Sequence, residues 1–180
     1  MRKDRGIIEY SLSLIFLMIC VLVILLTFSF RRSIIERTYL EDGLAASTLA
    51  AAIIDTDVYG ESEELIISDT DRAYLTFKQT LKTNLGLDDS FMPTSEAFME
   101  SQVNVLEFRV YNVKEGLVTE TLYDEHGNKQ VQILGVATMT PNNKVIESTT
   151  VYSKIEFDVK GYMNQVQRET MEYCADVVKN

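Results

Sequence analysis

The sequence predicts an α+β protein, with a long N-terminal transmembrane helix that extends outward, a second short helix and an antiparallel sheet of four to six strands. An uncharged apolar run near the N-terminus indicates the first helix. After Val103 the apolar residues change from helical spacing to alternation, which is typical of strands with one buried face. The 180-residue chain is long enough for one soluble domain of about 150 residues beside such an anchor.

The apolar run covers residues 12–30 and contains no charged residue, no Gly and no Pro. Its 19 residues match the roughly 20 that an α-helix needs to cross the hydrocarbon core of a bilayer. A secretory signal peptide would have a shorter apolar core followed by small residues at a cleavage site. Arg31 and Arg32 follow here instead, so we expect a retained, single-pass span in the cell membrane.

The sequence indicates the orientation of the span less clearly than it indicates the span itself. Three basic residues precede the run and three follow it closely, so the positive-inside comparison is nearly balanced, and the free N-terminal amine tips it toward an N-terminus inside the cell. We therefore expect residues 1–11 to form a cytoplasmic basic tail and the C-terminal part to be extracytoplasmic.

The helix is expected to continue beyond the membrane over residues 31–55, because this stretch has no Pro, a single Gly and an alanine-rich segment at 45–52. A helix over residues 7–54 would be about 70 Å long. Its apolar residues recur every three to five positions and predict a face that packs on the chain's own domain: Ile35, Tyr39 or Leu40, Leu44, Thr48 or Ala51, and Ile54. The small residues at 45–47 and 50–52 would also allow other helices to approach closely.

Residues 56–180 are expected to form the extracytoplasmic α+β domain. A polar loop is predicted over 55–64, and a helix over 69–85 with Asp69 or Thr70 as its N-cap and Gly86 as its stop. The predicted strands are residues 103–113 with an irregularity near Leu106, 117–123, 130–139, 151–159, and a last strand around 171–177 that could instead be a helix over 169–178. Residues 124–129 and 141–144 are predicted to be turns.

Charge and motif content argue against several classes of function. From Ser33 onward there are 12 Lys and Arg residues against 25 Asp and Glu residues, a formal charge of −13, which disfavours binding to nucleic acid. The lone His126 falls in a predicted turn, and Cys20 and Cys174 are expected in different environments and unpaired. With no phosphate loop, nucleophile elbow or metal-ligand spacing, we expect no enzyme activity, no catalytic residue, no metal and no cofactor.

The N-terminal sequence Arg5-Gly6-Ile7-Ile8-Glu9-Tyr10 places a basic tail, a glycine and a carboxylate before the apolar run. This arrangement resembles the N-termini of type IV pilin-like proteins, and the Glu-Tyr pair is most similar to the Flp pilins and TadE-like minor pilins of the tight-adherence system. The resemblance implies that a membrane peptidase cuts between Gly6 and Ile7, and that Glu9, with Tyr10, acts in assembly through the new amine of a neighbouring subunit. In the family the glutamate lies five residues after the glycine, whereas Glu9 lies three after Gly6. The alternative is an ordinary anchor in which Glu9 reaches the membrane interface beside Arg5 or Lys3.

Two functions follow as hypotheses. The first is a minor subunit or assembly component of a pilin-like surface filament or secretion apparatus (a pilus or pseudopilin system), acting by helix packing in the membrane. Its expected partners are the lipid bilayer, other pilin-like subunits and assembly-platform membrane proteins. The alternative is a membrane-anchored extracytoplasmic binding or sensory domain, for which the helix is only a tether.

Overall fold

The computed structural model describes residues 2–94, 99–135, 138–160 and 166–178. The chain divides into two compact units, residues 1–39 and 40–180. Helix α1 (Arg2–Ala51) supplies the described part of the first unit and the first twelve residues of the second. The expected continuous helix is therefore present, and it ends three residues before the predicted limit at Ile54.

The segment after α1 contains a short helix where the sequence predicted only a polar loop. Helix α2 (Thr56–Ser62) forms because the Asp55 side chain accepts hydrogen bonds from the backbone N–H groups of Asp57 and Val58, at 3.1 and 3.2 Å. It ends at Glu63, whose φ of 57° is left-handed. The loop prediction for 55–64 was wrong because an Asp before a polar stretch can cap a helix as readily as it starts a loop.

Helix α3 (Thr70–Leu85) confirms the predicted second helix. Asp69 is its N-cap and accepts a hydrogen bond of 2.9 Å from the Arg72 backbone N–H. Gly86, with φ 62°, ends the helix and donates its N–H to the Lys82 carbonyl.

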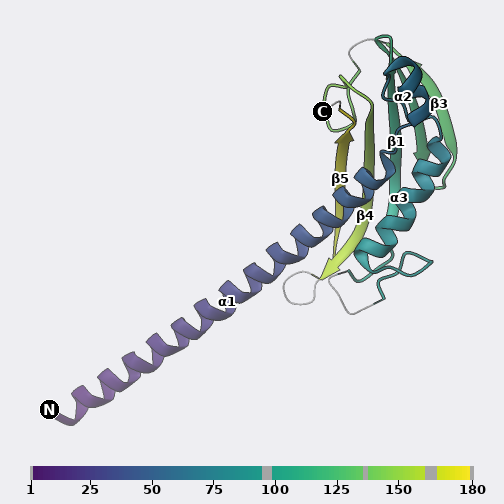
Figure 1. The fold of residues 1–180 in the computed structure, drawn as a ribbon. Helices are drawn as coiled ribbons and strands as arrows, with labels where there is room; N and C mark the ends of the chain where they lie inside the picture. The colour runs from purple at the N-terminus through teal and green to yellow at the C-terminus, as the bar shows by residue number, and fades with distance from the viewer. Residues whose placement is uncertain (1, 95–98, 136–137, 161–165, 179–180) are drawn as a thin grey trace. The chain divides into compact units, whose positions relative to one another are not determined.

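The sheet has five antiparallel strands in the order β3-β2-β1-β4-β5 (Figure 1). The strands are β1 (Asn104–Lys114), β2 (Leu117–Asp124), β3 (Lys129–Leu134), β4 (Thr150–Lys160) and β5 (Val166–Asp176). The pairing of β1 with β4 shifts register between Val105 and Glu107, which confirms the irregularity predicted near Leu106. Strand β3 ends at Leu134, earlier than predicted, and the last element is a strand rather than the alternative helix.

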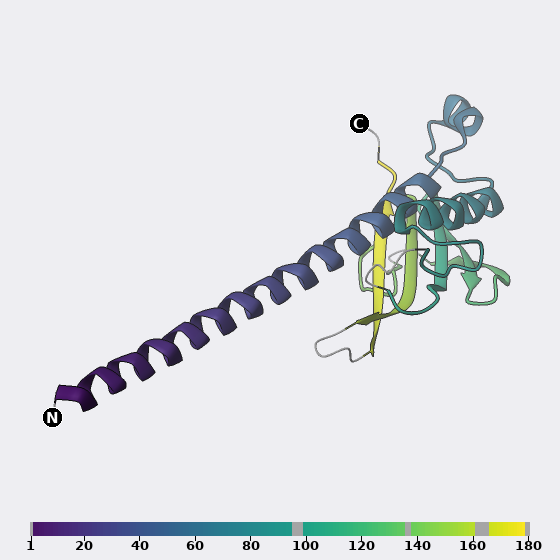
Figure 2. The same ribbon diagram turned by 90° about the horizontal axis from the view of Figure 1, so that it is seen from below.

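The main core of the second unit lies between one face of the sheet and two helical segments, the last turns of α1 and helix α3, which run side by side (Figure 2). Leu40, Leu44, Phe77 and Leu81 pack there with sheet residues such as Phe108, and all are buried. A second, smaller cluster on the other face consists of Tyr111, Val118 and Tyr152 under Ile146.

Small residues allow α1 and α3 to approach closely within this unit. A Cβ atom on Gly43 would lie 2.4 Å from Cδ2 of Leu85, and the Asn84 amide donates to the Ser47 hydroxyl at 3.0 Å. Thr48 shares a buried hydrogen bond of 2.6 Å with Ser153 of β4. The predicted apolar face is thus buried from Leu40 to Ala51, whereas Ile35, at its predicted beginning, is exposed and Ile54, at its predicted end, is partly buried.

Candidate functional site

The first candidate site is the apolar stretch of α1. Residues Glu9–Phe28 form one helical segment long and apolar enough to cross a membrane, and none of it is buried within the protein. Its large side chains, including those of Phe16, Met18 and Leu25, are exposed. Thr27 satisfies its hydroxyl by donating to the Val23 carbonyl at 2.8 Å, as a polar group in an apolar environment requires. The segment is therefore a candidate single membrane span.

The four residues implicated by the pilin resemblance all lie in the first turns of α1. Gly6 and Ile7 belong to the helical backbone, and the side chain of Ile7 lies outside the described part. Glu9 and Tyr10 are both exposed, at the N-terminal end of the apolar stretch. Consecutive helical residues point about 100° apart, so Glu9 and Tyr10 occupy different sides of the helix.

A second apolar surface lies on α1 within the folded unit. Ala46, Leu49 and Ala50 have the spacing of one helix face, and Ile53 follows just after the helix. Leu49 is 54% exposed and Ile53 is 48% exposed. We call Ala46, Leu49, Ala50 and Ile53 the outer α1 face. The sequence predicted that the small residues at 45–47 and 50–52 would let other helices approach, but it did not identify Leu49 and Ile53 as part of such a surface.

Charged residues form a network on the sheet face opposite the helices. The Arg109 guanidinium lies 2.7 Å from both Glu107 and Glu120, and the Gln132 amide also donates to Glu120. Burial alone would raise the pKa of Glu120, but hydrogen bonds from Gln132, Arg109 and Tyr111 outweigh it and lower that pKa. In the described part of the chain every buried side-chain polar group has a hydrogen-bond partner, so the network acts as a structural tie between β1, β2 and β3.

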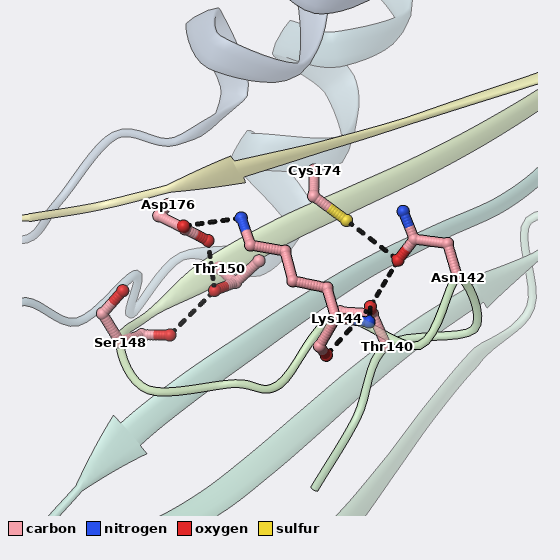
Figure 3. Close-up of polar contacts among 7 residues, drawn as sticks. All are labelled: Thr140, Asn142, Lys144, Ser148, Thr150, Cys174 and Asp176. Carbon is pink, nitrogen blue, oxygen red and sulfur yellow. Dashed lines mark hydrogen bonds and ion pairs between the residues drawn. The ribbon is translucent and has the colours of Figure 1, made fainter.

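A polar cluster joins the 140–144 turn to the end of β5 (Figure 3). Lys144 pairs with Asp176 at 2.6 Å, and the same carboxylate accepts a hydrogen bond from Thr150 at 3.0 Å. The Cys174 thiol donates to the Asn142 amide oxygen at 3.5 Å, and burial raises its pKa. A thiol with a raised pKa is mostly protonated at neutral pH and is a poor nucleophile. The cluster therefore fastens a loop rather than providing reactive chemistry.

One cleft of about 370 Å³ opens near the start of β1. Its lining includes Tyr74 and Lys78 of α3, Phe91, and the exposed His126. The Lys78 ammonium lies 5.3 Å from the Tyr74 ring centre and 5.5 Å from that of Phe91. Phe91 has a left-handed φ of 60°, and Leu106 lies at the β1 irregularity. His126, predicted as an exposed turn residue, is confirmed as one.

Within residues 2–94, 99–135, 138–160 and 166–178, no three His, Cys, Asp or Glu side chains lie close enough together to hold a metal ion. Both cysteines are free.

Comparison with known proteins gives no match to any protein-family model, curated protein or solved structure.

Proposed function

We propose that this protein is a minor subunit or assembly component of a pilin-like surface filament or secretion apparatus, held in the cell membrane by α1 with its folded unit outside the cytoplasm. The observation that supports the proposal is the exposure of apolar side chains on α1, both over residues 10–28 and on the outer α1 face. Helix packing, first in the bilayer and then against other subunits, is the proposed action.

We propose that lipid surrounds the apolar stretch of the first unit. Fully burying one Leu, Ile or Phe side chain is worth about 1.5–3 kcal/mol, and Glu9–Phe28 carries many such side chains. A helix can enter hydrocarbon because each backbone group along it is satisfied internally. This stretch therefore has both the apolar surface and the backbone hydrogen bonding that a membrane span requires.

We propose that other subunits pack against the outer α1 face. An isolated tether needs no second apolar face after the helix has packed on its own domain, and Ala46 and Ala50 allow close approach of another helix. The resemblance at Gly6, Glu9 and Tyr10 supports the same role, because a carboxylate beside hydrocarbon is costly unless a cation compensates it. The amine released by cleavage after Gly6 would supply that cation in a neighbouring subunit.

Cleavage between Gly6 and Ile7 can be read from the mass of the protein isolated from its own cell membranes. A chain that begins at Ile7 is the expected result. If the intact mass includes Met1 or Arg2, no leader is removed and the processing proposal is wrong.

Assembly through the outer α1 face is tested by Leu49→Lys. Lys keeps a high helix propensity, and Leu49 is exposed, so the folded unit should be unaffected. Losing a buried Leu contact should weaken association by about 1.5–3 kcal/mol, which is roughly 10- to 100-fold. The measurement is the fraction of the chain recovered in sheared surface filaments or in chemically cross-linked oligomers from native membranes.

The matched control is Leu75→Lys on α3, an equivalent change at a helical position that is 65% exposed. It should leave assembly at the wild-type level. Equal recovery of the Leu49→Lys and Leu75→Lys chains would contradict assembly through the outer α1 face.

The second candidate function is a membrane-anchored binding or sensory domain, which the cleft beside Tyr74, Lys78 and Phe91 favours. Its mixture of aromatic, cationic and amide-bearing side chains is of a kind that holds small polar ligands. Loss of binding or signalling with normal assembly in a Lys78→Met chain would support this alternative over the filament role.

A further inference from the structure

The two edge strands of the sheet differ sharply in how well they are protected against pairing with another chain. Edge strand β5 contains Arg168, Glu169, Glu172 and Asp176, and charged residues of this kind discourage edge-to-edge pairing. Edge strand β3, of sequence Lys-Gln-Val-Gln-Ile-Leu, has a single charged residue and no Pro. Its pairing with β2 is also free of any bulge. From Gln130 to Leu134, strand β3 therefore has no charged residue, no Pro and no bulge that would discourage pairing with another strand.

The side chains of β3 add an apolar surface to this open edge. Val131 is 61% exposed and Ile133 is 76% exposed, although both are β-branched residues suited to a paired strand. They lie on the same sheet face as Lys129, which is already engaged, because its ammonium pairs with Asp71 at 2.9 Å. Beyond Lys129, the exposed edge is uncharged.

The backbone of β3 also presents the correct groups outward. The Asp124 N–H donates to the Asn128 carbonyl at 3.2 Å. This bond shows that the backbone groups of Asn128 face β2, and along a strand the backbone groups of successive residues point alternately toward and away from the neighbouring strand. By that alternation Gln130, Gln132 and Leu134 direct their N–H and C=O groups toward β2. Those of Lys129, Val131 and Ile133 point to the open edge.

We propose that β3 is a homotypic interface, at which the edge of one copy pairs antiparallel with the β3 edge of a second copy to join two sheets. A two-fold axis at Gln132 sets Val131 of each copy opposite Ile133 of the other. In this register the outward N–H and C=O groups of both residues meet those of the second copy, and the two apolar pairs share one sheet face.

A second copy fits this edge because the strand is complementary to itself. The register places Lys129 opposite Gly135 of the other copy, so no two like charges face each other. The same operation at β5 would bring several carboxylates together in a chain whose net charge is already −10. Because the interface uses only residues of the folded unit, it is independent of the proposed role of α1.

The test is site-specific disulfide formation in the full chain reconstituted into phosphatidylcholine vesicles, with Cys20 and Cys174 replaced by Ala. Gln132→Cys places one thiol on the proposed axis, where directly opposed Cβ atoms lie within about 4.5–5.5 Å and a disulfide can form. Oxidation with copper phenanthroline should convert most of this chain to a covalent dimer. Val166→Cys, at an exposed position on the other edge strand, is the control and should give at least tenfold less dimer.

Two further variants in the Gln132→Cys background separate edge pairing from random collision. Val131→Pro removes an N–H that points outward and is not needed for pairing with β2, so it should keep the fold and reduce cross-linking at least tenfold. Ile133→Lys keeps the backbone intact and should do the same by introducing charge at the edge. Equal dimer yields from Gln132→Cys and Val166→Cys, or cross-linking that neither variant reduces, would overturn the proposal.

Discussion

At the scale of single residues, the most constrained charge in the folded unit is the Glu120 carboxylate. Its side chain is 2% exposed, and it is held by Arg109 and Gln132 from the strands on either side of β2. Removing one member of a buried pair leaves the other without full compensation, which costs more than the pair itself contributes. Arg109 keeps Glu107 as a second partner, which limits that cost.

Glu120→Gln should therefore lower the free energy of unfolding by about 2 kcal/mol at neutral pH. The pKa of Glu120 is lowered by folding, so its stabilising contribution is present above the ordinary Glu pKa and is lost as the pH falls through the folded value. The difference between wild type and variant should shrink in acid. Thermal unfolding of the full chain in detergent, followed by circular dichroism, measures this.

The control for that substitution is Glu107→Gln, because Glu107 contacts the same Arg109 but has a side chain that is 30% exposed. It should be less destabilising than Glu120→Gln. Equal losses, or a difference that stays constant as the pH falls, would show that the buried carboxylate is not the centre of the network.

Some residue roles were readable from the sequence because they depend on near neighbours. Asp69 caps a helix that begins at the next residue, and Gly86 supplies a left-handed stop. The partnership of Arg109 with Glu120 depends on the pairing of two strands, so it could not be deduced from local spacing alone. Glu107 and Arg109 are two residues apart on one strand and so lie on the same face, and this spacing was the sign in the sequence that they could form an ion pair.

At the scale of elements, long periodic segments were predicted well and short ones were not. Helix α1, helix α3 and strand β4 follow from apolar spacing sustained over many residues. Helix α2 was missed because a seven-residue segment is too short to show an apolar periodicity, and its start is stabilised by the Asp55 cap. Strand β3 was predicted too long because apolar residues continue in the sequence up to Met139, after the pairing with β2 has ended at Leu134.

The two sides of α1 within the folded unit show why the candidate assembly surface was only partly predicted. The small residues at 43 and 47 fit against α3, so part of the small-residue stripe is used inside the domain rather than between subunits. The side formed by Leu49 and its neighbours has no such internal use. Which side of a helix remains available is decided by tertiary packing, and sequence periodicity alone does not reveal it.

At the scale of the whole molecule, the folded unit begins inside α1 rather than after it. Leu40, Leu44, Thr48 and Ala51 are buried in its core, whereas the sequence suggested a domain from residue 56 onward with residues 31–55 as an extension. A fragment that started at Thr56 would lack these side chains and leave α3 and the sheet partly uncovered. A fragment that starts at Leu40 keeps the core complete.

The membrane role of α1 is measured most directly by comparing the full chain with the fragment Leu40–Asn180 after expression, an alkaline carbonate wash and high-speed sedimentation. The full chain should remain in the membrane pellet, because Glu9–Phe28 supplies the only stretch in the described residues that is apolar and long enough to span a bilayer. The fragment should stay in the supernatant as a folded protein with a cooperative unfolding transition. A full chain released by carbonate, or a folded fragment that still sediments with membranes, would contradict anchoring by α1.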